Sequence, residues 1–88
     1  MNNTRDRRKP LATFDGKVFH VEFRGRSLDV PAATGDNGDV LVELDSVTHW
    51  IIAEGEAEAP EVSVEDLGAI LDAIENTADA AGLSIWFE

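Results

Sequence analysis

The chain has 88 residues, 43% of them apolar, no cysteine and a formal net charge of −11. This length allows one domain with a modest core, and the lack of cysteine excludes disulfide frameworks and thiolate metal sites. The longest uninterrupted apolar run, Trp50 to Ala53, is far shorter than the roughly 20 residues that span a bilayer. No apolar run follows the basic first residues as in a secretory signal, so we expect a cytoplasmic protein.

The charge is divided unevenly along the chain. Every Lys and Arg lies at or before Arg26, whereas Ser27 to Glu88 contains fifteen Asp and Glu and no Lys or Arg. Nucleic acid and anionic membranes are therefore poor partners, because both need cationic patches. A basic protein partner is favoured, since complementary charge speeds association. The alternative is a proteome-wide acidic bias that serves solubility.

The first third of the chain predicts a tail and a hairpin. Residues 1–10 are polar and basic and predict a disordered tail, ahead of one domain at residues 11–88. Residues 12–14 lead into Asp15-Gly16, a strong β-hairpin signal. Residues 17–23 then alternate in polarity. This pattern predicts a second strand with one face formed by Phe19, Val21 and Phe23.

Further alternation predicts more strands. Residues 26–30 align Leu28 with Val30, and the turn formers at residues 32–39 predict a loop. The strongest apolar run follows, and it predicts a central strand with one face formed by Val40, Val42 and Leu44.

This central strand is expected to be interrupted and then followed by a loop. The Asp45-Ser46 pair is expected to kink or bulge it, and a second short strand is expected from Val47 to Ile52. An acidic loop then carries the chain past Pro60.

A helix and a last strand complete the domain. Ser63 is expected to cap the helix, with Asp66 three residues later as its partner, and Gly82 to end it. Residues 83–87 alternate, with Ser84 and Trp86 opposite to the apolar side chains. The apolar stripe of the helix, at helical spacing, comprises Leu67, Ile70, Leu71, Ile74, Ala78 and Ala81.

The element order predicts the fold class. Strands, one helix in the C-terminal half and a last strand indicate an α+β fold, in which the helix packs on one face of an antiparallel sheet.

No catalytic or metal-binding constellation stands out. His20 and His49 are the only histidines, and they lack the spacing of a zinc site. Residues 35–39 resemble part of a calcium loop but lack the closing Glu of an EF-hand. We therefore expect no enzyme activity, metal or cofactor. A small metal-dependent enzyme that uses the two histidines and nearby acids is the minor alternative, and metal analysis would decide it.

Two acidic segments are the candidate binding surfaces. Residues 54–66 contain no Lys or Arg, and three acids of the helix lie at i, i+3 and i+7. An ordinary solvated face is the alternative reading of such a stripe. Trp50 directly precedes the acidic loop and is expected to be a partly exposed anchor. The predicted partner-binding residues are Asp45, Trp50, Glu54, Glu56, Glu58, Glu61, Asp72, Glu75 and Asp79.

Two segments follow one another along the chain: VLVELDSVTHW at residues 40–50 and, after a loop, VEDLGAILDAIENTADAAGLSIWFE at residues 64–88. Their order and spacing resemble the bacterial immunity protein 74 family of polymorphic toxin systems. The likeness covers roughly residues 17–88, and it includes GRSLDV at residues 25–30 as an early strand. One departure is the loop after the Trp, where the family has an Asp-Pro-Pro-like run and this chain reads IIAEGEAEAP. The matching positions are Leu44, Asp45, Ser46, Trp50, Ile70, Ile74 and Gly82, followed by the strand to Glu88.

The resemblance implies a small cytoplasmic protein that binds a cognate toxin and blocks it. Such toxins are often nucleases or other enzymes with basic substrate sites, so the resemblance and the charge both favour a basic partner. A structural or regulatory interaction module, acidic without a toxin partner, is the alternative, and it would form a homodimer or dock on a larger assembly. A toxin gene immediately upstream would favour the first reading.

Overall fold

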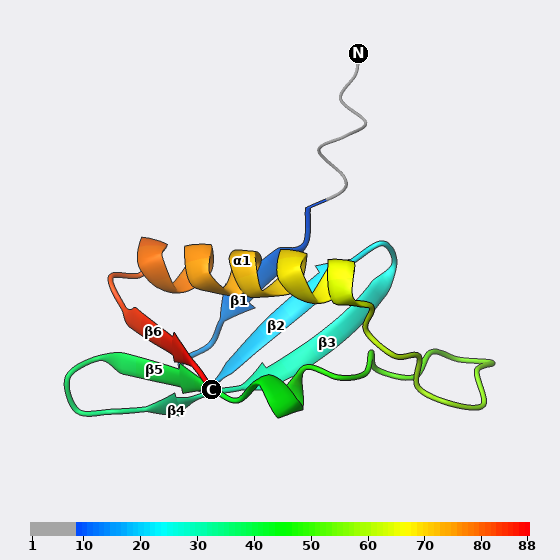
Figure 1. Ribbon diagram of the computed structural model, residues 1–88, viewed down its shortest axis with the longest axis horizontal. Helices are drawn as coiled ribbons and strands as arrows, with labels where there is room; N and C mark the ends of the chain where they lie inside the picture. Colours follow the sequence, from blue (N-terminus) through cyan, green and yellow to red (C-terminus); the bar gives the residue numbers. More distant parts are fainter. Residues whose placement is uncertain (1–8) are drawn as a thin grey trace, which may run out of the picture.

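The computed structural model describes residues 9–88, so the tail predicted at residues 1–10 lies almost wholly outside the described part of the chain. Two small sheets are joined by one long helix that lies over them (Figure 1). The elements in chain order are β1 (Leu11–Phe14), β2 (Val18–Phe23), β3 (Arg26–Pro31), β4 (Ala33–Thr34), β5 (Asp39–Val42), a 3₁₀ helix (Leu44–Ser46), α1 (Val64–Ala80) and β6 (Ser84–Phe87).

The first sheet is an antiparallel meander of β1, β2 and β3. As predicted, Asp15-Gly16 turns the chain from β1 into β2, and Asp15 Oδ1 accepts hydrogen bonds from the backbone N–H groups of Lys17 and Val18, both at 2.8 Å. The turn from β2 to β3 has positive φ at both central residues, 54° at Arg24 and 80° at Gly25. Such turns match the twist of the flanking strands.

The second sheet combines both strand orientations. β4 and β5 are antiparallel, whereas β6 runs parallel to β5. The predicted antiparallel pairing is therefore correct for β1–β3 and for β4–β5, which lie in two sheets where one was predicted, and it does not extend to β6. The physical reason is the connection: α1 returns the chain to the starting end of β5, and a strand that follows such a crossover is parallel. β5 is central in this sheet, as predicted.

The segment after β5 differs from the prediction. The strand ends at Val42, and Leu44 begins a 3₁₀ helix in which it is 37% exposed, so it does not share the buried face. Ser46 Oγ donates a 2.6 Å hydrogen bond to the Glu43 carbonyl and closes this turn. The predicted strand at Val47 to Ile52 is also wrong, because only an isolated bridge between His49 and Glu61 forms there.

Both predicted ends of α1 are confirmed. Ser63 Oγ accepts a hydrogen bond from the Asp66 N–H at 3.1 Å. At the other end Gly82 has φ 76°, a conformation that favours glycine. Its N–H donates to Asp79 O, and the next N–H, of Leu83, donates to Ala78 O, which together form a Schellman motif. The predicted stripe is one residue too long, since Ala81 is exposed at the C-cap.

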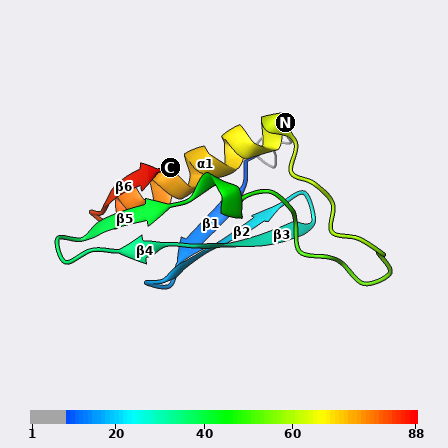
Figure 2. The same ribbon diagram turned by 60° about the horizontal axis from the view of Figure 1, so that its bottom comes forward.

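The core lies between α1 and the two sheets. α1 packs on β1 and β6 (Figures 1 and 2) and buries Ile70, Ile74 and Ala78. Among residues 9–88, no helix is long and apolar enough to cross a membrane. The largest fully buried side chains are Phe19, Val21, Val30, Val40, Val42, Ile70 and Ile74.

Replacing Ile74 by alanine tests the packing of α1. Because Ile74 is fully buried, the change should lower the free energy of unfolding by about 2–5 kcal/mol. Val64→Ala is the matched control in the same helix, since Val64 is 86% exposed, and it should change stability by about 0.5 kcal/mol or less. Urea unfolding followed by circular dichroism measures both, and equal effects would contradict the packing described.

Candidate functional site

The acidic loop is an anchored arm. It leaves the 3₁₀ helix, projects from the body of the protein at the right of Figure 1 and returns to α1. Three backbone hydrogen bonds hold its base: Trp50 N–H to Pro60 O at 2.8 Å, Val62 N–H to Thr48 O at 2.8 Å and Ile51 N–H to Ser27 O at 2.9 Å. The last bond ties the loop to β3, so the acids between these points are presented from an ordered base.

Glu56 holds the acidic loop in place through internal hydrogen bonds. Both of its carboxylate oxygens accept hydrogen bonds from the Arg26 guanidinium, at 3.2 and 3.0 Å, and Oε1 also accepts the Ala53 N–H at 2.8 Å. These bonds, the one from Arg26 first, lower the pKa of Glu56, and the same pair raises the pKa of Arg26. Glu56 was predicted to face a partner, but its 28% exposed side chain is committed to Arg26.

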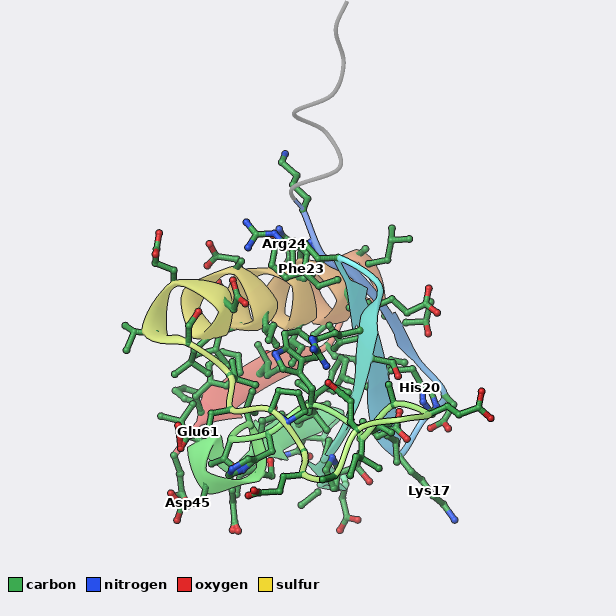
Figure 3. The ribbon with its side chains drawn as sticks, turned by 90° about the vertical axis from the view of Figure 1, so that its right-hand side faces the viewer. Lys17, His20, Phe23, Arg24, Asp45 and Glu61 are labelled. Carbon is green, nitrogen blue, oxygen red and sulfur yellow. The ribbon has the colours of Figure 1, made fainter. Side chains whose placement is uncertain are left out.

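A second arginine of the first sheet reaches the start of α1. The Arg24 guanidinium lies 4.6 Å above the ring of Phe23 and 3.5 Å from Asp66 Oδ1, as Figure 3 shows for Arg24 and Phe23. Stacking on an aromatic ring holds the cation in place. The acidic segment therefore receives two internal cations that its own sequence does not contain.

The remaining loop acids are exposed. Glu54, Glu58 and Glu61 are exposed, and within residues 9–88 none of them takes part in an ion pair. Asp45, in the 3₁₀ helix, is likewise exposed. Figure 3 places Asp45 and Glu61 on the same side of the protein, opposite to Lys17 and His20. We call these four exposed carboxylates the loop patch, after the 3₁₀ helix and the loop that carry them: Asp45, Glu54, Glu58 and Glu61.

The helix acids form a separate patch. Asp72, Glu75 and Asp79 are all exposed, on the side of α1 away from the buried Ile70 and Ile74. At about 1.5 Å per residue, Asp79 lies about 20 Å along the helix from Asp66. Asp72, the first of the three, lies about 9 Å along the helix axis from Asp66. The helix acids therefore begin near the acidic segment and extend along α1.

Of the two tryptophans, Trp50 is buried and Trp86 is exposed. Trp50 is only 4% exposed and packs against Phe23, with ring centroids 6.5 Å apart, so the prediction of a partly exposed anchor is wrong. The residues after β5 fold back onto the core instead of pairing as a strand, which turns this ring inward. Trp86 is 62% exposed on β6. The alternation of residues 83–87 was the sequence signal for its outward direction.

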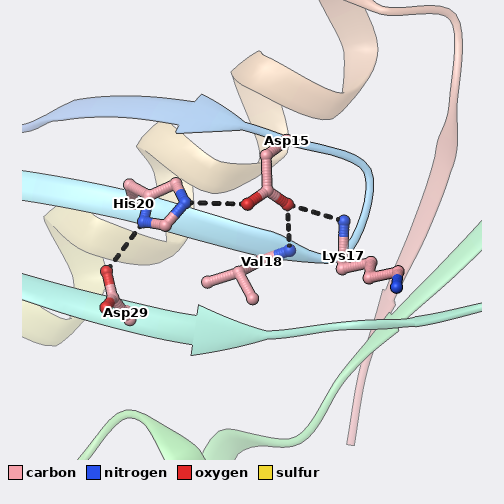
Figure 4. Close-up of polar contacts among 5 residues, drawn as sticks. All are labelled: Asp15, Lys17, Val18, His20 and Asp29. Atoms are coloured by element: carbon pink, nitrogen blue, oxygen red, sulfur yellow. Dashed lines mark hydrogen bonds and ion pairs between the residues drawn. The ribbon is translucent and has the colours of Figure 1, made fainter.

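A histidine lies between two carboxylates on the outer face of the first sheet (Figure 4). His20 Nε2 is 3.0 Å from Asp15 Oδ2, and Nδ1 is 2.8 Å from Asp29 Oδ1. The hydrogen bonds to Asp15 and then Asp29 raise the pKa of His20. The pKa of Asp15 falls to about 2, chiefly through His20 and then through the Val18 and Lys17 N–H groups. These contacts join the hairpin turn, β2 and β3, which is a structural role.

The described residues gather no other titratable cluster of this kind. His49 lies 3.1 Å from the hydroxyl of its neighbour Thr48, far along the chain from His20. Across residues 9–88, no group of three or more His, Asp or Glu is arranged to hold a metal ion.

Stability should depend on the protonation of His20. The folded-state pKa is raised above the unfolded value of about 6.5. The stabilisation is therefore fully present below about pH 6.5 and is lost as the pH rises through the raised pKa. The difference in Tm between the native chain and His20→Gln should be larger at pH 5.5 than at pH 8.5.

A double-mutant background separates this contribution from other pH effects. With Asp15→Asn and Asp29→Asn already present, His20→Gln should lower Tm by similar amounts at both pH values. If the Tm difference between the native chain and His20→Gln is larger at pH 8.5 than at pH 5.5, the hydrogen bonds assigned to His20 are contradicted.

A family model matches nearly all of the described chain. The model of the family described as "Immunity protein 74" matches residues 14–88, a range that includes all six strands except the start of β1, together with α1 and the loop patch. Searches of curated proteins and of solved structures found no match. With the family model covering nearly the whole folded domain, the chain belongs to the immunity protein 74 family.

Proposed function

We propose that this chain neutralises a cognate toxin in the cytoplasm of the cell that makes it, by covering a basic surface of that toxin with the loop patch. Membership of an immunity family implies a toxin partner. A basic surface on the toxin is supported by a difference among the loop acids in whether they form an ion pair. Glu56 is held by Arg26, whereas Glu54, Glu58 and Glu61 are exposed without an ion pair in the described chain.

The anchored base gives these acids a physical advantage. A flexible acidic segment would lose conformational freedom on binding, at about 0.5–1.5 kcal/mol for each immobilised side chain. Here the backbone bonds of Trp50, Ile51 and Val62 already order the base of the arm. The loop therefore loses less conformational freedom when a partner binds. A larger part of the charge attraction then contributes to the affinity.

Charge also determines how the complex would form. Within the described chain, the carboxylates in ion pairs are Asp15, Asp29, Glu56 and Asp66, and the net charge is −11. A negative field of this kind attracts a basic partner over several ångströms and raises the association rate. A nuclease is a suitable target, because its substrate cleft must attract phosphates and is therefore basic. The helix acids, Asp72, Glu75 and Asp79, would provide a second contact.

Removing the charge of the loop patch tests the proposal. Glu54→Gln, Glu58→Gln and Glu61→Gln together should weaken binding to the toxin encoded beside this chain's gene by about 10-fold or more. Most of the effect should be in the association rate, because charges at the rim of an interface act mainly there. Surface plasmon resonance measures the rates, and survival on co-expression with the toxin measures protection.

A control of equal charge change distinguishes position from net charge. Glu22→Gln, Asp36→Asn and Asp39→Asn also remove three exposed carboxylates, but away from the loop patch. This variant should bind within about 3-fold of the native chain. The proposal fails if both variants weaken binding equally, or if the loop variant protects cells as well as the native chain.

A further inference from the structure

Within residues 9–88, the outer edge of β6 has no backbone partner. β6 is the last strand of its sheet and pairs only with β5. Glu88 directs both its N–H, to Val42 O, and its carbonyl, to Leu44 N–H, toward β5 and its continuation. Backbone groups alternate in direction along a strand, so those of Ile85 and Phe87 face the open edge. Within residues 9–88, no hydrogen bond joins this edge to another segment.

A groove runs beside this edge. It has a volume of about 520 Å³ and lies between the C-terminal half of α1 and β6. Glu75 and Asp79 line its helix side, and Ser84, Ile85 and Trp86 line its strand side. Within the described chain, neither Glu75 nor Asp79 takes part in an ion pair. The groove therefore combines the backbone of Ile85 with two carboxylates that form no ion pair within residues 9–88.

Trp86 adds an aromatic surface at the same place. Its side chain is 62% exposed, on the face of β6 opposite to the partly buried Ile85 and Phe87. Solvation does not favour an exposed tryptophan ring on a folded domain. Tryptophan is enriched at the interface positions that contribute most of the binding energy. Its ring can also attract a Lys or Arg side chain.

We propose that the β6 edge binds an extended segment of the toxin that carries Lys or Arg on alternate residues, a proposal that rests on the toxin-binding function above. The segment would add a strand beside β6, using the backbone groups of Ile85 and Phe87. Its basic side chains would reach Glu75 and Asp79, while an apolar or cationic side chain covers Trp86. This surface is distinct from the loop patch.

The spacing of the acids agrees with a strand as the occupant. Glu75 and Asp79 are four residues apart on α1, which is about 6 Å along the helix axis. Side chains on one face of a strand repeat about every 6.6 Å. Where an added strand runs along the helix axis, two basic residues at its alternate positions would each meet one carboxylate.

A second copy of this chain is a poorer occupant. It would bring its own Glu75 and Asp79 to an edge already lined by the same acids, and each copy carries a net charge of −11. Like charges brought together at an interface oppose association. Charge complementarity thus favours a basic partner over self-association.

Amide hydrogen exchange on the full-length ¹⁵N-labelled chain tests the added strand. The probe is the polypeptide encoded by the gene immediately upstream of this chain's gene, the expected toxin. The Ile85 and Phe87 amides should exchange at least about 10-fold more slowly in the complex than in the free monomer. Protection of these amides already in the free monomer would assign the edge to the chain's own N-terminal segment, and protection with doubled mass in light scattering would assign it to a second copy; either result overturns the proposal.

Two substitutions test the same edge through affinity. Trp86→Ala and Ser84→Lys change exposed side chains, and each should weaken toxin binding by about 10-fold or more, the first by removing the ring and the second by placing a cation against the basic segment. Thr34→Lys is the matched control, because Thr34 is exposed on β4 at the opposite edge of the same sheet. It should bind within about 3-fold of the native chain. Circular dichroism checks that all three variants remain folded.

The outcomes separate this proposal from the function on which it rests. If the native chain binds the toxin and the β6 variants bind equally well, the edge is not the site, and the proposed function stands. If the native chain does not bind the toxin at all, both proposals fail.

Discussion

Burial of the apolar stripe of α1 against the two sheets is the constraint on which the remaining structure depends. Ile70, Ile74 and Ala78 are fully buried, and their burial brings the chain back from β5 to a parallel β6. The same packing determines which residues face outward. With one side of the helix against the core, Asp72, Glu75 and Asp79 are exposed. The loop that precedes α1 is carried to the other end of the molecule (Figure 2).

Two arginines and one histidine of the first sheet make ion pairs within the described chain. Arg26 holds Glu56, Arg24 lies beside Asp66, and His20 joins Asp15 to Asp29. Each of these contacts ties separate elements of the fold together. Exposed ion pairs contribute little stability individually, so their main consequence is positional. They orient the acidic loop on the first sheet and leave the other carboxylates directed at solvent.

Local signals in the sequence were sufficient for the local structure. Asp15-Gly16 predicted the first hairpin, Ser63 and Gly82 predicted the ends of α1, and strand alternation predicted which side chains of β2 are buried. Each depends on residues within a few positions of one another. The same alternation contained the outward direction of Trp86, although Trp50 was the residue selected as the anchor.

Contacts between distant segments could not be predicted in the same way. The pairing of Arg26 with Glu56 joins residues 30 positions apart, and nothing near Glu56 in the sequence indicates it. The parallel β5–β6 pair depends on a crossover that closes only when α1 packs. Trp50 is buried because the chain after β5 folds inward, where an alternating pattern suggested a strand. In the candidate site, composition identified the acids, and tertiary structure determined which of them are exposed without an ion pair among residues 9–88.

The dependence of the association rate on ionic strength tests the central claim most directly. If an outward-facing acidic surface attracts a basic toxin, the rate constant should fall by about 10-fold or more between 20 mM and 500 mM NaCl, as salt shortens the range of the field. The dissociation rate should change much less. An association rate that stays constant over this range would contradict the claim that charge complementarity guides the recognition.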